Sequence, residues 1–176
     1  MEEHRIILTC FGIFEKDLLE RLAKDVSNEF HMPVSLEVSH LDLNPFYSPG
    51  RRQYDANKLL QQISSDEHTD FVKTLGLFRV DLFIPVLTYI FGQAILGGNG
   101  GIASAYRLKN ELYGLKRNDE LMAERFSKEV IHELGHTFGL IHCHFTTCVM
   151  RSATYVGDID QKSLHFCSKC RAEAGL

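Results

Sequence analysis

The segment Val130–Met150, VIHELGHTFGLIHCHFTTCVM, holds four of the nine histidines and two of the five cysteines in a chain of 176 residues. It contains the pattern H-E-x-x-H, formed by His132, Glu133 and His136. On an α-helix, two histidines four positions apart lie one turn apart on the same face, so both imidazoles can reach one zinc ion at about 2.0–2.1 Å. Glu133 follows the first histidine but points in a different direction, which suits a general base acting on metal-bound water. The pattern therefore predicts a zinc centre that catalyses hydrolysis.

The residues after this pattern predict a third ligand. Gly139 can end a helix because it tolerates positive φ, and the resulting turn would bring His142 back towards the metal. The extended pattern H-E-x-x-H-x-x-G-x-x-H should arise by chance only about 10⁻⁴ times in such a chain. Three histidine ligands leave the fourth zinc position open to water, which is the catalytic arrangement. The complete pattern disfavours the simpler interpretation of structural histidines on an amphipathic helix.

Four cysteines form a second candidate metal site. Their spacings, x₄ in one pair and x₂ in the other, are typical of a closed zinc site with four sulfur ligands at about 2.3 Å. Such a site would be structural, and its binding energy would tie residues 143–176 to the end of the histidine-bearing helix. Three alternatives stay open: two disulfides, a redox-active C-x-x-C, or replacement of one sulfur by His144 or His165. The four cysteines are Cys143, Cys148, Cys167 and Cys170.

The composition is that of one globular domain. Hydrophobic residues make up 44% and charged residues 24%, and the net charge of −4 gives no electrostatic footprint for nucleic acid or an anionic membrane. The longest apolar stretch, residues 82–91, is about half as long as a membrane-spanning helix. The N-terminal sequence has neither the pattern of a secretory signal nor that of a transit peptide, so we expect a cytoplasmic protein with reduced thiols.

Hydrophobic periodicity predicts alternating strands and helices before the histidine-bearing helix. Cys10, inside the first strand, is expected to be a buried small apolar residue. Near the other end of the chain, Asp158 or Asp160 is expected to cap a last short helix. The predicted elements are a β-rich segment at 5–14, a helix at 15–30, a strand at 34–40, a loop at 44–55, a short helix at 56–65, and two strands within 70–96 that are broken near Gly76–Asp81.

The glycine-rich segment GGNGG, residues 97–101, has two interpretations. Gly98, Gly100 and Ala103 match the dinucleotide-binding pattern G-x-G-x-x-A, which requires a helix directly after the glycines. The sequence that follows, IASAYRL, is instead typical of a strand. We therefore predict a glycine turn between two strands.

The helix that carries the histidines is predicted to run from Asn118 to about Leu140. Its apolar stripe lies on the side opposite His132 and His136. The helix can therefore pack one side into the core while both imidazoles face a cleft. The residues of the stripe are Met122, Phe126, Val130, Leu134 and Phe138.

These motifs resemble those of the archaemetzincins, a branch of the metzincin zinc peptidases. The resemblance rests on HELGHTFGLIHC, followed by CVM and CSKC, and covers Val130 to Cys170 closely. The segment GQAILGGNGGIASAYRL is similar to the strand–turn–strand that precedes the active-site helix in this family. The resemblance implies an α+β, metzincin-like fold, in which a twisted mixed β-sheet lies above the active-site helix. Residues 1–176 would form a single catalytic domain.

The resemblance also implies roles for individual residues. His132, His136 and His142 would hold the catalytic zinc, Glu133 would be the base, and Met150 would lie in a turn beneath the metal. The four cysteines would hold a second, structural zinc, which makes two zinc ions per chain.

An edge strand within Gly98–Tyr106 would, by the same resemblance, line the cleft and pair with an extended peptide. The sequence departs from some metzincins at one position. Some metzincins have a tyrosine two residues after the methionine, whereas this chain has Ser152 at that position. A tyrosine, Tyr155, lies three residues further on.

We thus expect a zinc metallopeptidase that hydrolyses peptide bonds in a peptide or protein substrate, acting as a monomer without nucleic-acid or membrane partners. Glu133 would take a proton from zinc-bound water, which attacks the scissile carbonyl, and would return the proton to the departing amine. The rival hypothesis is a zinc-stabilised peptide-binding or regulatory module with a latent metalloprotease site. The intact Glu133 argues against it, because a purely structural site has no use for a base there.

Overall fold

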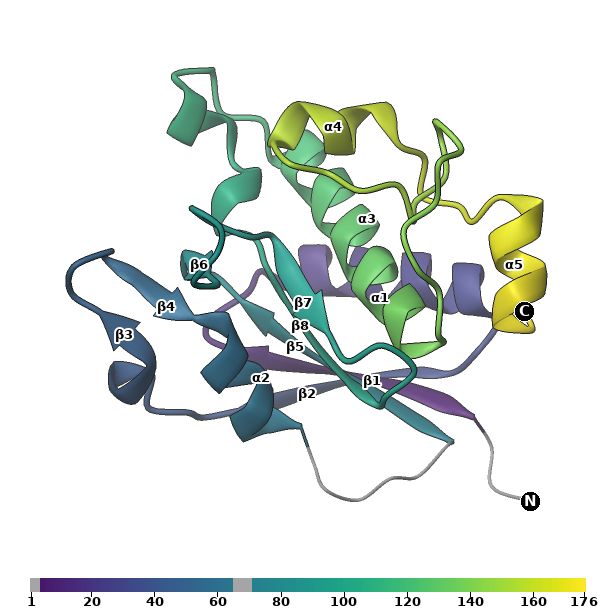
Figure 1. Cartoon of the computed structure of the whole chain (residues 1–176), viewed down its shortest axis with the longest axis horizontal. Coiled ribbons are helices and arrows are strands. Elements are labelled where there is room, and N and C mark those ends of the chain that lie inside the picture. Colours follow the sequence, from purple (N-terminus) through teal and green to yellow (C-terminus); the bar gives the residue numbers. More distant parts are fainter. Residues whose placement is uncertain (1–3, 65–70) are drawn as a thin grey trace.

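A twisted five-stranded sheet lies at the centre of the computed structural model, which describes residues 4–64 and 71–176 (Figure 1). Its strands are β1 (Arg5–Phe11), β2 (Val34–Ser39), β5 (Val72–Phe78), β7 (Gly92–Ala94) and β8 (Gly100–Ser104). The strand order is β2-β1-β5-β8-β7, in which β7 alone pairs in the antiparallel direction. This mixed sheet confirms the predicted fold class. Met1–Glu3 and the ends of two predicted elements, at Ser65 and Asp70, lie outside the described residues.

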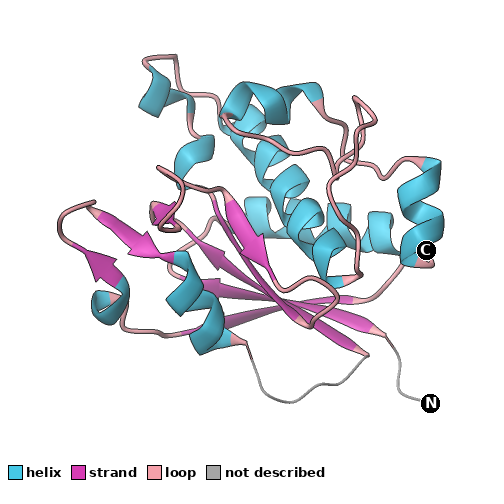
Figure 2. Ribbon diagram, viewed as in Figure 1, coloured by secondary structure: helices cyan, strands magenta, loops and turns pink. Residues whose placement is uncertain are grey.

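Helices cover both faces of this sheet (Figure 2). One face carries α1 (Lys16–Phe30) and α3 (Asp119–Thr137), and the other carries α2 (Ala56–Ile63). The predicted helix at 15–30 is thus confirmed, as is the short helix after residue 55.

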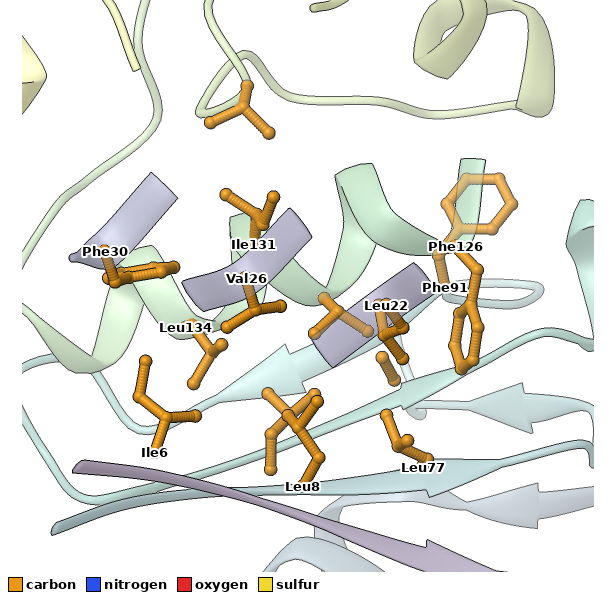
Figure 3. Close-up of a cluster of buried hydrophobic side chains, with 14 of the residues drawn as sticks. Ile6, Leu8, Leu22, Val26, Phe30, Leu77, Phe91, Phe126, Ile131 and Leu134 are labelled. Atoms are coloured by element: carbon orange, nitrogen blue, oxygen red, sulfur yellow. The ribbon is translucent and has the colours of Figure 1, made fainter. Parts of the chain in front are cut away.

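The larger hydrophobic core lies between the sheet, α1 and α3. Figure 3 shows Leu22 and Val26 of α1 and Leu134 of α3 above Ile6 and Leu8 of β1. All five side chains are at most 1% exposed. Burial of such a side chain contributes about 1.5–3 kcal/mol, so α3 is fixed firmly against the sheet. Cys10 is buried in the same core, as predicted.

A second, smaller sheet occupies part of the segment that was predicted to be a loop, so that prediction was partly wrong. Tyr54 pairs with Leu82, a contact between residues far apart in the chain that local turn residues do not reveal. The elements are the 3-10 helix η1 (Asn44–Phe46) and the strands β3 (Tyr47–Ser48), β4 (Gln53–Asp55) and β6 (Leu82–Phe83), in the order β3-β4-β6.

The predicted break within Gly76–Asp81 is found at the far end of that range, because β5 continues to Phe78 and β6 begins at Leu82. Gly76 is a glycine for a packing reason. A Cβ at this position would lie 2.6 Å from Ile63 Cδ1 of α2, so the missing side chain lets the helix approach the sheet. The break comes only after Phe78, and it leads to the short strand β6.

The glycine-rich segment forms the predicted turn between two strands, β7 and β8. Gly97 has φ of 66°, which favours glycine. A strand and not a helix follows the turn, so the dinucleotide-binding interpretation is excluded. The strand order also corrects one expectation: β8 lies between β5 and β7, and the edge strand is β7 instead of a strand within Gly98–Tyr106.

The C-terminal part consists of short elements packed around α3. Asn118 caps α3, since its Oδ1 accepts from Leu121 N–H at 3.0 Å. Asp158 takes part in the cap of α4, although the N-cap residue itself is Tyr155. From the third helical position its carboxylate accepts from the backbone N–H of Tyr155 at 3.3 Å, as part of a capping box, and from Thr154 N–H at 2.8 Å. None of the helices in the described residues is long and apolar enough to cross a membrane. The remaining elements are the 3-10 helices η2 (Tyr106–Leu108) and η3 (Asn110–Tyr113), and the helices α4 (Val156–Gln161) and α5 (Ser168–Ala174).

Candidate active site and metal centres

A cleft of about 590 Å³ lies between α3 and the edge strand β7. The residues of the H-E-x-x-H pattern line it from α3, and Gly92–Ala94 line it from β7. Its other walls are formed by residues 84–91, which precede β7, by residues 141–142, and by residues 152–154. The predicted amphipathic arrangement of α3 is confirmed: Phe126, Val130 and Leu134 are fully buried in the core while the histidines face the cleft.

His132 and His136 are held with their Nε2 atoms towards each other. His132 Nδ1 lies 2.8 Å from Val149 O, and His136 Nδ1 lies 2.7 Å from Leu140 O. Each Nδ1–H therefore donates to a backbone carbonyl, which leaves Nε2 available to bind a metal ion. The two Nε2 atoms are 3.2 Å apart. Two nitrogens on a tetrahedral zinc at about 2.0–2.1 Å would be about 3.4 Å apart, so the pair has the required spacing.

The chain turns sharply after α3 and brings His142 to the same place. Gly139 has φ of 86°, its N–H donates to His136 O at 3.0 Å, and Leu140 N–H donates to Gly135 O at 3.1 Å. This is the hydrogen-bond pattern of a Schellman ending, as the glycine predicted. The His142 ring centroid lies 5.1 Å from that of His136, and the ligand atoms of the three histidines all lie within 4.8 Å of one another.

The environment of the three imidazoles favours their neutral form. Burial lowers the pKa of His132 well below its ordinary value, and the Lys162 charge adds to this effect. Burial also lowers the pKa of His136 and of His142. Neutral imidazole is the form that binds zinc. The donor set and its protonation therefore fit a zinc ion.

Glu133 lies beside the histidines and against β7. A Cβ on Gly92 would lie 2.8 Å from Glu133 Oε1, so the carboxyl group touches the backbone of the edge strand. Burial raises the pKa of Glu133 well above its ordinary value; the Glu129 charge raises it further, and the Lys162 charge opposes this. In the absence of metal the carboxyl group therefore holds a proton more strongly than an exposed glutamate does.

Met150 packs directly beneath the H-E-x-x-H turn. It is fully buried, and a Cβ on Gly135 would overlap its Sδ atom. The Met150 carbonyl accepts from Cys143 N–H at 2.9 Å, so the methionine segment joins the two candidate metal sites. Ser152 lines the cleft, whereas Tyr155 is 59% exposed and is not among the lining residues.

The four cysteines meet in one cluster at the end of the chain. Their Sγ atoms all lie within 4.8 Å of one another, and Cys143 Sγ is 3.8 Å from Cys167 Sγ. Two sulfurs on a tetrahedral zinc at about 2.3 Å would be about 3.8 Å apart. The cysteines are free thiols, and His144 and His165 are not part of the cluster. The cluster is therefore suited to one zinc ion with four sulfur ligands.

The thiols of this cluster differ in acidity. A hydrogen bond from Cys170 N–H is the largest cause that lowers the pKa of Cys167 to about 7. Burial raises the pKa of Cys170 and of Cys148. In the absence of metal, the first thiolate of the cluster therefore forms at Cys167.

Sequence reasoning missed two buried carboxylates that support these centres. Glu129 lines the cleft and forms an ion pair with Lys162 at 3.2 Å, and both side chains are at most 4% exposed. Glu29 of α1 accepts from Phe166 N–H at 2.8 Å and pairs with Arg171, which anchors the cysteine segment to α1. Glu129 is one helical turn before Glu133, so the helical spacing could have placed its carboxylate on the same face as Glu133. Nothing in the sequence around Glu29 indicated that it would contact the cysteine segment.

Comparison with known proteins agrees with this geometry. The model of peptidase family M54 matches residues 12–174. The archaemetzincin of Methanocaldococcus jannaschii is 34% identical over 166 residues, which cover 94% of this chain and 90% of the relative. The crystal structure of a zinc-dependent peptidase from Methanocorpusculum labreanum superposes with a TM-score of 0.84 at 31% identity, covering 96% of this chain and 99% of that chain. The crystal structure of the archaemetzincin from Methanopyrus kandleri superposes with a TM-score of 0.83 at 32% identity, covering 99% of this chain and 94% of that chain. The chain therefore belongs to peptidase family M54, the archaemetzincins, and is a zinc metallopeptidase.

Proposed function

We propose that His132, His136 and His142 hold the catalytic zinc and that Glu133 is the general base of peptide hydrolysis. The observation that carries the proposal is the convergence of three neutral imidazoles beside one buried carboxyl group in an open cleft. Zinc bound there supplies a Lewis acid that polarises the scissile carbonyl and lowers the pKa of the attacking water.

Glu133 moves the proton in this reaction. Its carboxylate accepts a proton from the attacking water and delivers it to the amine that leaves, so that it acts first as base and then as acid. A carboxyl group with a raised pKa is suited to the second step, because it binds the proton long enough to hand it on. Its position against Gly92 places this chemistry beside the edge strand.

The edge strand β7 offers a binding site for the substrate backbone. Phe91 O accepts from Ser104 N–H at 2.8 Å, and Ile95 N–H donates to Gly100 O at 3.0 Å. In the alternating ladder of an antiparallel pair, the N–H and C=O groups of Gly92 and Ala94 then point away from β8. An extended peptide could pair with these groups as an added strand. We propose that the substrate binds in this way.

The four cysteines hold, in this proposal, a second zinc that is structural. A site with four sulfur ligands has no open position for water. It would fix residues 143–176 to α3 next to His142, which is adjacent to Cys143 in the chain. Thiol ligands of this kind fit a reducing compartment, so we propose a cytoplasmic protein. We further propose that it acts as a monomer, because all the proposed ligands and the base come from one chain.

The test is metal content together with peptide hydrolysis. Wild type should contain about two zinc ions, and both His136→Ala and Cys170→Ala should reduce this to about one. Glu133→Ala should keep both zinc ions and lose hydrolysis of a peptide mixture, whereas Glu111→Ala, at an exposed residue away from the cleft, should change neither. Loss of zinc from Glu133→Ala would contradict its role as a base. Zinc retention by a wild type that hydrolyses no peptide would favour the rival peptide-binding module.

A further inference from the structure

We propose that the cleft is closed at one end by Tyr89 and Thr154, so that it accepts the last few residues of a peptide instead of the middle of a chain. This inference rests on the proposed function, because it concerns the substrate of the same cleft. It implies that the enzyme removes short fragments from the carboxyl end of peptides.

Tyr89 and Thr154 belong to opposite walls of the cleft. Tyr89 is in the segment that leads into β7, whereas Thr154 follows Met150 on the facing wall. Tyr89 Oη donates to Thr154 O at 3.2 Å, and both residues line the cleft. The bond links the segment that leads into β7 to the segment that leads into α4, and the ribbons of these two segments can be followed in Figure 1. It therefore bridges the two walls beside the start of β7.

The ring of Tyr89 is held in place from two sides. The guanidinium of Arg107 lies 4.4 Å from the ring centroid, and the ring of Phe91 makes an edge contact at 5.6 Å. Arg107 is itself fixed by two hydrogen bonds to Asp81, at 2.7 and 2.6 Å. Because the Tyr89 ring is packed between a cation that is itself paired and a second aromatic ring, it forms a fixed part of the cleft wall.

The backbone on both sides of the closure is also anchored. Gln53 Nε2 donates to Thr88 O at 2.8 Å, and Arg51 donates to two further carbonyls of the same wall at 2.9 and 3.2 Å. On the facing wall, Thr154 N–H donates to Asp158 at 2.8 Å. Moving either wall segment away from the other would strain these bonds as well as the bond between Tyr89 and Thr154. The closure is therefore a fixed boundary of the cleft and not a lid.

The chain length between the base and the closure limits the substrate. Tyr89 is three residues before Gly92, and Gly92 touches Glu133. Three residues span at most about 11 Å, even when fully extended. An extended substrate advances about 3.3 Å per residue. About three substrate residues can therefore lie between the scissile bond and Tyr89.

The direction of the substrate follows from the edge strand. Antiparallel pairing is slightly more stable per residue than parallel pairing, so an added strand favours the direction opposite to β7. The substrate then runs towards its carboxyl end from Ala94 to Tyr89, and the carboxyl-terminal residues meet the closure.

The closure limits how many substrate residues fit beyond the scissile bond. It does not bind the terminal carboxylate of the substrate through a positive charge. Apart from the histidines, the charged side chains among the described residues that line the cleft are Glu129 and Glu133. No lysine or arginine of this lining is available to bind a terminal carboxylate. Peptides with an amidated carboxyl end should therefore be cleaved as well as those with a free one.

The experiment uses the full zinc-loaded chain and a mixture of synthetic peptides of about fifteen residues, which span roughly 50 Å and exceed the cleft. Fragments are identified by mass spectrometry for free and amidated carboxyl ends. Wild type should release fragments of one to about three residues from the carboxyl end, equally for both forms. Tyr89→Ala, which opens the end, should shift the released fragments to greater length.

Two variants serve as controls. Tyr89→Phe keeps the ring and loses the bond to Thr154, so it tests the closure in a protein whose packing is preserved; a smaller shift in the same direction is expected. Tyr113→Phe loses a similar hydroxyl bond, to Arg107 O at 2.6 Å, outside the cleft lining and should leave fragment lengths unchanged.

The outcomes separate this inference from the proposed function. Glu133-dependent cleavage by wild type with long fragments on both sides of the cut would overturn the closure and leave the peptidase role intact. Release of short fragments from the amino end would overturn the proposed direction. A wild type that cleaves nothing would refute the proposed function, and the inference with it.

Discussion

Gly135→Ala tests whether Met150 is packed against the H-E-x-x-H turn of α3 as the structure has it. In a helix interior, replacing glycine by alanine ordinarily stabilises a protein by up to about 1 kcal/mol. At Gly135 the new Cβ would overlap Met150 Sδ and lie 3.1 Å from Met150 Cε and 3.2 Å from Phe166 Cε1. Met150 is fully buried and Phe166 is 6% exposed, so neither can move into solvent.

The expected magnitude follows from these two opposing effects. Overpacking a dense core costs about 1–3 kcal/mol, which exceeds the helix gain of about 1 kcal/mol. We therefore expect the free energy of unfolding to fall by up to about 2 kcal/mol. Displacement of Met150 would also move Val149, whose carbonyl holds His132 at 2.8 Å. Disturbing such a partner of a metal ligand typically weakens metal binding by about 10–100-fold.

The assays are urea denaturation of the zinc-loaded protein and zinc transfer to a competing chelator. Gly157→Ala in α4 is the matched control, because a Cβ there makes only an ordinary contact of 3.4 Å with Tyr155. In a Met150→Ala background the overlap with Met150 is absent and only the 3.2 Å contact with Phe166 remains, so the loss of stability caused by Gly135→Ala should be much smaller. Equal stability of Gly135→Ala and Gly157→Ala, with unchanged zinc affinity, would refute the packing argument.

Two further predictions concern buried charge and thiol acidity. Glu129→Gln leaves the Lys162 ammonium, whose side chain is fully buried, without its carboxylate, so the free energy of unfolding in urea should fall by about 3–5 kcal/mol. The exposed pair of Glu20 is the comparison, and Glu20→Gln should cost less than about 0.5 kcal/mol; similar losses for both would contradict the burial argument. In zinc-free protein, the depressed pKa of Cys167 means that thiolate predominates above about pH 7, so its alkylation by iodoacetamide should rise through that pH, as measured by mass spectrometry. Cys10, whose pKa is raised by burial, should stay unreactive, and equal rates at the two cysteines would show the acidity difference to be wrong.

The features that depend on local geometry could be predicted from the amino-acid sequence alone. The spacing of His132 and His136 equals one helical turn, and Gly139 supplies the positive φ that ends the helix and returns His142. The β-rich composition of β1 and the periodicity of α1 were likewise readable, because each depends only on residues a few positions apart. The pattern of cysteines predicted a cluster, since metal-ligand spacing is also largely local.

Long-range packing fixes which strand forms the edge of the sheet and which segments meet across the cleft. β7 and β8 are joined by one turn, and either could have been outermost until β5 paired with β8. The contacts of Glu129 with Lys162 and of Tyr89 with Thr154 join segments that are 33 and 65 residues apart. Periodicity carries no information about such pairs, because they depend on how whole elements pack. The residues that carry the chemistry of the site can thus be recognised from motifs of neighbouring residues, whereas the shape of the cleft depends on contacts between residues far apart in the chain.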